Sequence, residues 1–180
     1  MRLFLLGVVM TILVIIICGL LILRAGYVNF NADQTPSAME KKLGMKASDA
    51  SVERRATNMA NPLTANDETL MAGARLYRNN CAVCHGDPAQ MSSPLADSFY
   101  PPAPQFLMDA PDMPEYQNYY IVRHGIRWTG MPSWRTQMNE TQTWQVITLL
   151  SHLDKLPAAV RDEMSKAPTP KQEPTADLAV

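Results

Sequence analysis

The sequence predicts an all-α fold, in which a small helical domain follows a single N-terminal transmembrane helix. Three observations predict it. The chain begins with a long apolar run, Leu3 to Leu23, which Arg2 and Arg24 bound. Farther along, three segments combine apolar residues at helical spacing with residues that start or end helices. No segment carries the pattern of a convincing strand.

The first predicted element is a membrane-spanning helix over residues 1–24. The 21 uncharged residues from Leu3 to Leu23 extend about 31 Å as a helix, which matches a hydrocarbon core of ~30 Å. A cleaved signal peptide has a shorter apolar region and a small-residue cleavage site, which Ile22 to Gly26 does not offer. The large residue Ile17 before Cys18 is unsuited to lipoprotein processing. We therefore predict an uncleaved anchor.

Residues 25–63 are predicted to form a linker with short amphipathic helices. Pro36-Ser37 is a suitable start for the first of them, with Met39 and Leu43 on one face. A second amphipathic turn has Val52, Ala56 and Met59 on one face. Because this segment has little core of its own, we expect it to pack on the following domain or on a partner subunit.

Residues 64–156 are predicted to form the helical domain. In its first helix, Thr64 is the expected N-cap with Asp67 three residues on, and the helix runs from Glu68 to Arg78. The middle helix spans Glu115 to His124, between Pro114 and Gly125. The last helix follows Asn139, whose partner Gln142 completes a capping box, and Pro157 closes it. The proline-rich stretch from Gly86 to Pro114 is expected to be a loop. Residues 157–180, rich in Pro, Ala, Lys and Glu, are expected to be mostly disordered.

The most informative motif is Cys81-Ala82-Val83-Cys84-His85, which reads C-x-x-C-H. This pattern is the attachment signature of a c-type haem, because two thiols one helical turn apart can each bond to the same porphyrin. The adjacent His85 then supplies the proximal imidazole. The sequence contains this motif once, so we predict one covalently attached haem c.

Other interpretations of the cysteine pair are weaker. A thioredoxin-like pair needs a strand before it, and the residues before Cys81 indicate a helix. A structural zinc site needs four ligands, and His124, His152 and Cys18 form no second pair. A simple Cys81–Cys84 disulfide would leave the following histidine unexplained.

The loop after the middle helix offers a second iron ligand. Met131 follows Gly130 and precedes Pro132, and its thioether is a soft ligand suited to haem iron. Met138, Met108 and Met113 are alternatives, and a methionine in a chain with 12 of them usually packs in a core. Arg127, Trp128 and Trp134 flank this loop and are candidates either for propionate contacts or for packing.

These motifs in combination resemble the class I cytochrome c family. The resemblance rests on the run from Gly73 into the C-x-x-C-H motif, on the stretch from His124 to Pro132, and on the helix from Trp144 to Leu153. It implies a cytochrome c-like haem fold, His85 and Met131 as axial ligands, and one-electron transfer. It also implies that Gly73 packs against the last helix, at Leu149 or Trp144. The carbonyl of Pro101 or Pro102 is then expected to accept the His85 N–H.

The leading functional prediction is a membrane-anchored mono-haem cytochrome that carries single electrons in a bacterial respiratory chain and is not itself an enzyme. Alternatives are a haem subunit of a larger membrane oxidoreductase, an open-site haem enzyme or gas sensor, and a purely structural membrane subunit. The expected partners are redox proteins and the membrane; a net charge of −1 does not indicate nucleic acid. Haem attachment outside the bacterial inner membrane places the predicted haem domain in the periplasm.

Overall fold

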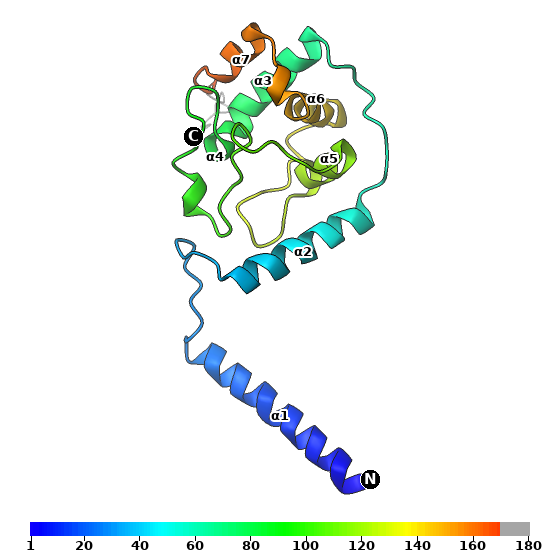
Figure 1. Ribbon diagram of the computed structural model, residues 1–180, viewed down its shortest axis with the longest axis vertical. Helices are drawn as coiled ribbons and strands as arrows, with labels where there is room; N and C mark the ends of the chain where they lie inside the picture. The colour runs from blue at the N-terminus through cyan, green and yellow to red at the C-terminus, as the bar shows by residue number, and fades with distance from the viewer. Residues whose placement is uncertain (170–180) are drawn as a thin grey trace, which may run out of the picture. The chain divides into compact units, whose positions relative to one another are not determined.

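The computed structural model describes residues 1–169 of the chain (Figure 1). Within this range the protein is all-helical, with seven α-helices, two short 3₁₀ helices and no strand, which confirms the predicted fold class. The chain divides into two units, Met1–Ala32 and a second unit that begins at Asp33. Each is described by itself.

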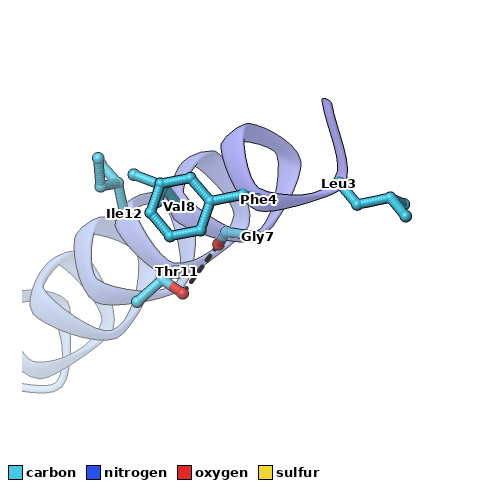
Figure 2. Close-up of a pocket in the computed structure, with 6 residues that line it drawn as sticks. All are labelled: Leu3, Phe4, Gly7, Val8, Thr11 and Ile12. Carbon is cyan, nitrogen blue, oxygen red and sulfur yellow. Dashed lines mark hydrogen bonds between the residues drawn. The ribbon is translucent and has the colours of Figure 1, made fainter. Parts of the chain in front are cut away.

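The first unit is dominated by α1, Arg2–Arg24. It has a mean hydropathy of 3.2 over its most apolar window and no buried residue, so it is long and apolar enough to cross a membrane. Figure 2 shows its one hydroxyl near the N-terminal end: Thr11 Oγ1 donates to the carbonyl of Gly7 at 2.9 Å. This bond pairs the hydroxyl hydrogen of Thr11 within the helix, as hydrocarbon surroundings require.

The second unit begins with α2, Ala38–Arg55, one continuous helix where the sequence predicts short ones. Ser37 caps it by accepting a hydrogen bond from the Glu40 amide at 3.2 Å. α2 joins the first expected helix to the start of the second, but it ends at Arg55, so the expected amphipathic turn over Val52, Ala56 and Met59 is wrong beyond that residue. Val52 is buried at 6% exposure and α2 contacts α5. The segment thus packs on the helical domain, one of the two outcomes that the sequence left open.

The core of the second unit lies between α3 (Asp67–Asn80), α5 (Glu115–His124) and α6 (Glu140–Leu150). α3 crosses α6 at Gly73, where an added Cβ would lie 2.3 Å from the Gln145 carbonyl oxygen. The buried residues are mostly apolar, among them Tyr77, Ile147 and Leu149, each under 2% exposed. Their burial from three separate helices supplies the main stabilising contribution.

The helix ends follow the sequence with two exceptions: the N-cap of α3, and the end of α6 at Leu150, where a separate 3₁₀ helix, Leu153–Lys155, follows although the sequence predicts one helix up to Pro157. Asn139 and Gln142 form the predicted capping box of α6, with both hydrogen bonds at 2.9 Å. Gly125, with φ 68°, ends α5 as predicted. The expected N-cap of α3 at Thr64 is wrong, because Asn66 accepts the Thr69 amide at 2.8 Å instead. Both residues are good caps, and the chain's entry geometry selects the second.

The C-terminal part differs from the expectation of disorder. Residues Ala158–Met164 form α7, which packs against α3 and buries Val160 and Met164. The polar, proline-rich composition that predicts disorder does not reveal that these two apolar residues find a partner surface on α3. The expectation for residues 170–180 lies outside the described residues.

Candidate haem-binding site

The C-x-x-C-H motif lies at the junction of α3 and the short helix α4, Ala82–His85. Backbone hydrogen bonds carry the helical path across the junction: the Cys81 amide donates to Tyr77 at 2.7 Å, and the His85 amide to Cys81 at 3.0 Å. Gly86, with φ 77°, then turns the chain away. The motif is thus presented on a rigid turn, with Cys81 and Cys84 both as free thiols and His85 buried at 8% exposure.

The orientation of His85 is set by one hydrogen bond and one stacked ring. Its Nδ1 lies 2.8 Å from the carbonyl oxygen of Pro104, and Phe106 stacks on the imidazole with ring centroids 4.3 Å apart. Because a carbonyl can only accept, Nδ1 carries the proton and Nε2 has the free lone pair. Burial lowers the pKa of His85, against the opposing effect of the Pro104 bond. The imidazole is therefore neutral near pH 7, the form that binds metals.

The expected role of Pro101 or Pro102 is corrected to Pro104. The reason is Gln105, whose amide Nε2 donates to the Cys84 carbonyl at 3.0 Å and to the Ala103 carbonyl at 2.7 Å. Its Oε1 also accepts the Ser93 amide at 2.7 Å. These bonds hold the loop in the register that places the Pro104 carbonyl beside His85.

Tyr77 is a further supporting residue that the sequence reasoning missed. Its buried hydroxyl lies 3.2 Å from the His85 carbonyl and 2.8 Å from the Gly86 carbonyl, so it donates to the end of the motif. Burial is the main cause of the raised pKa of this phenol, which keeps the donor proton in place. The available signal was its position on the apolar face of α3, one turn before Cys81.

The pKa values of the two thiols argue against a thioredoxin-like redox pair, and the surrounding residues give no support to a zinc site. A thioredoxin-like pair needs a lowered thiol pKa, whereas burial, with a smaller effect of Cys84, raises the pKa of Cys81 to about 12. Burial also raises the pKa of Cys84. Within residues 1–169, no group of three or more His, Cys, Asp or Glu side chains could hold a metal ion, so a zinc site has no support there.

Met131 lies in a tight loop between α5 and α6. The Met131 amide donates to Thr129 Oγ1 at 3.1 Å, and the Met131 carbonyl accepts from the Ile126 amide at 3.1 Å. A Cβ at Gly125 would lie 2.6 Å from the Pro132 carbonyl carbon, so only glycine fits there. The half-buried Met131 side chain packs against the hydrophobic core.

The Met131 loop touches the loop that orients His85. A Cβ added at Gly130 would lie 2.3 Å from the Phe99 ring, five residues before Pro104. The fold therefore brings the Met131 loop into contact with the loop that supplies the Pro104 carbonyl to His85. This contact joins residues far apart in the sequence, so no local sequence pattern predicts it.

The other residues that the sequence suggested as iron ligands or haem contacts lie in different surroundings. Met138 is buried in the core at 3% exposure, Met108 is 69% exposed, and Met113 is half-buried. His124 is exposed and its ring lies tilted against that of Tyr120, and His152 Nδ1 lies 2.9 Å from the Thr148 carbonyl. Trp134 packs against the core, Arg127 is exposed, and Trp128 is 91% exposed with φ 62°.

The expected contact of Gly73 with the last helix involves backbone and an aliphatic side chain. The Gln145 carbonyl is the nearest group, and the Leu149 Cβ would lie 3.1 Å from an added Cβ. Trp144 instead stacks on Tyr119, with ring centroids 4.3 Å apart. Of the two sequence candidates, Leu149 is the one beside Gly73.

Comparison with known proteins decides the family of this region. Residues 68–150 match the family described as cytochrome C oxidase, cbb3-type, subunit III. They form a class I-like c-type cytochrome domain. This cytochrome domain contains the whole C-x-x-C-H motif and Met131.

Among solved structures, a chain of the Kuenenia stuttgartiensis reducing HAO-like protein complex is similar to this one. The two are 19% identical, with a TM-score of 0.44, over 54% of this chain and 50% of that one. The similarity thus spans half the length of that relative. No curated protein matched the sequence.

A c-type cytochrome domain implies a bound haem c, and the residues present fit that group. Cys81 and Cys84 are free and one helical turn apart. The neutral imidazole of His85 has its Nδ1 already bonded, and among the described residues its Nε2 has no hydrogen-bond partner. Two thiols and a preoriented imidazole are the donors that covalent haem attachment needs.

Proposed function

We propose that this protein is a membrane-anchored c-type cytochrome that carries single electrons through one haem ligated by His85 and Met131. The cytochrome domain supports the general role, haem-based electron transfer. The observation that carries the proposal is the hydrogen bond from His85 Nδ1 to the Pro104 carbonyl beside two free thiols. This bond leaves the lone pair of His85 Nε2 available to a metal ion.

Each residue of the site has a distinct task in this proposal. The haem supplies a one-electron couple, and the chain holds it and adjusts its surroundings. Cys81 and Cys84 form the covalent links. The carbonyl of Pro104 holds the His85 proton on Nδ1 and raises the basicity of Nε2. The Met131 thioether would hold the iron as a second protein ligand, which would favour electron transfer over the binding of small ligands.

The anchor and the cysteines support a bacterial inner-membrane location with the cytochrome domain in the periplasm. α1 is apolar and long enough to span the bilayer, and Tyr27 follows it closely, where aromatic residues favour the interface. Outside α1 the only cysteines are those of the haem motif. A chain without a spare thiol suits an oxidising compartment.

A second candidate is a dedicated haem subunit of a larger membrane oxidoreductase. The description of the matching family, which names a subunit of an oxidase, favours it. Purification in mild detergent separates the candidates, because a freestanding carrier is isolated alone and a subunit is isolated with its complex.

The test of the proposal is the visible spectrum of the detergent-solubilised protein, oxidised and reduced, with and without carbon monoxide. A low-spin c-type spectrum with a weak far-red Met–Fe(III) band and no carbon monoxide shift is expected. Ready carbon monoxide binding would favour an open-site enzyme or gas sensor instead. The double variant Cys81→Ser/Cys84→Ser should hold no haem that survives denaturation, which controls for covalent attachment.

A further inference from the structure

Helix α2 has two opposite faces, and only one of them is used within the protein. Because successive residues turn by ~100°, Met39 and Leu43 lie on one side of the helix and Ser48 and Val52 on the other. Val52 is 6% exposed and Ser48 is half-buried, whereas Met39 is 72% and Leu43 62% exposed. The first half of α2 thus presents large apolar side chains to solvent.

The rotation of α2 about its axis is fixed by contacts at both ends. Near its start, Glu40 lies close enough to the Tyr100 hydroxyl to be the main cause of the raised pKa of Tyr100, about 12. Near its end, Val52 is buried and the helix contacts α5. Met39 and Leu43 therefore cannot turn inwards without breaking these contacts.

Basic residues flank the exposed apolar pair. Lys42 and Lys46 lie beside Met39 and Leu43 on the same side of the helix, and both are exposed. α2 as a whole is not strongly amphipathic, and the feature that suits the interface of an anionic membrane is local: an exposed apolar pair with lysines beside it in the first half of the helix. Anionic lipid headgroups complement these two lysines, and the acyl boundary accommodates the apolar side chains; Asp49 and Glu53 lie on the same side of α2 but farther along the helix, away from the apolar pair.

The short segment between α1 and α2 keeps α2 within reach of the membrane surface. Only 13 residues, 25–37, separate the end of α1 from the start of α2. Fully extended, they span at most about 45 Å, so the start of α2 cannot leave the vicinity of the bilayer that holds α1. A short tether also raises the effective concentration of the surface, so a weak contact suffices.

We propose that the Met39/Leu43 face of α2 docks on the anionic lipid surface of the membrane that α1 spans. This inference rests on the proposed anchor and goes beyond electron transfer, because it assigns the cytochrome domain a defined orientation to the bilayer. The domain is attached to α2 through the buried Val52 and the contact with α5. Lipid contact at α2 therefore sets which side of the domain faces a partner.

The test uses the full-length holoprotein in phosphatidylcholine vesicles that contain phosphatidylglycerol. Cys18→Ser removes the free thiol of α1, and a bimane label is attached at Leu43→Cys. Fluorescence is compared with and without doxyl-labelled lipid, so that quenching by the haem cancels in the ratio. The matched control is Gly44→Cys on the same helix, where an added Cβ meets nothing within 4 Å.

We expect several-fold stronger doxyl quenching at position 43 than at position 44. The difference should shrink in vesicles of phosphatidylcholine alone, at high salt, and in the variant Lys42→Gln/Lys46→Gln, because each weakens the electrostatic attraction. Equal, weak quenching at both positions would overturn the proposal. So would a label at position 43 that is shielded from aqueous iodide but not quenched by lipid, since a protein would then cover the face.

A label on the natural Cys18 separates this inference from the anchor itself. Strong doxyl quenching at Cys18 with weak quenching at position 43 refutes lipid docking of α2 and leaves the anchor standing. Weak quenching at Cys18 refutes the anchor, and with it the docking.

Discussion

At the scale of single residues, the candidate methionines differ in their surroundings. The chain contains 12 methionines, and sequence alone left four of them as candidate ligands. Met138 is buried in the core and Met108 is largely exposed. Met131 instead lies in a loop whose Gly130 contacts Phe99, in the loop that supplies the Pro104 carbonyl to His85. Met131 is therefore the methionine that we propose as the second iron ligand.

The corresponding prediction is that Met131→Ala opens the iron to exogenous ligands. The far-red band should disappear, carbon monoxide should bind the reduced protein, and the potential should fall by a sizeable fraction of the ~0.8 V range that axial ligands span. Met138→Leu is the matched control, because it alters a buried methionine and should leave spectrum and potential unchanged. An unaltered ferric spectrum in Met131→Ala would mean that another group ligates the iron.

A second residue-scale prediction concerns the buried carboxylate of Glu163 on α7. It accepts hydrogen bonds from Lys166 at 2.6 Å and from Arg78 of α3 at 2.8 Å. The Lys166 bond is the main cause of its lowered pKa, against burial, with the charges of Lys166, Arg78 and Arg75 adding to it. Since Arg78 is also buried, Glu163→Gln should destabilise the fold by roughly 3 kcal/mol at neutral pH.

The pH dependence of this effect has a definite sign. A carboxyl whose folded pKa lies below its ordinary value of 4.5 contributes stability above that pH and loses it as the pH falls through the folded pKa. Urea titrations of wild type and Glu163→Gln should therefore differ fully at neutral pH and converge as the pH falls below 4.5 and through the lowered folded pKa. Asp162→Asn, an exposed neighbour on α7, is the control; an equal loss in both variants would contradict the buried pair.

At the scale of elements, the crossing of α3 and α6 depends on one glycine. An alanine at Gly73 would place a methyl group 2.3 Å from the Gln145 carbonyl oxygen, so the two helices must separate. The cost of overpacking exceeds the gain in helix propensity.

We expect Gly73→Ala to lower the free energy of unfolding by roughly 1–2 kcal/mol. Gly44→Ala on α2 is the matched control, because its new methyl group meets nothing within 4 Å and should stabilise the helix by about 0.5–1 kcal/mol. Urea denaturation followed by circular dichroism measures both. A neutral or stabilising Gly73→Ala would show that α3 and α6 are not closely apposed at this point.

At the scale of the whole molecule, the chain separates into an apolar unit and a unit with a core of its own. A form that begins at Asp33, exported behind a cleavable signal, should carry haem with an unchanged spectrum. Any association with membranes should be reversed by salt, since α1 is the one helix within residues 1–169 that could span a bilayer. A truncated protein that requires detergent for release would contradict this division.

Local patterns determined much of this protein without tertiary information. Helix periodicity and end residues predicted α3, α5 and α6, because capping and turn chemistry act over three or four residues. The C-x-x-C-H motif predicted a covalent haem, since both thiols and the histidine lie on one helical turn. The length and apolarity of Leu3 to Leu23 predicted the membrane-spanning candidate.

The tertiary structure alone decided what depends on contacts between distant residues. Pro104 rather than Pro101 or Pro102 meets His85 because Gln105 bonds a carbonyl 21 positions earlier. α7 is held on α3 by the ion pair of Glu163 with Arg78, which lies 85 positions earlier in the sequence. Such partners leave no periodic trace in the sequence, because the free energy that selects them comes from burial and pairing across the fold.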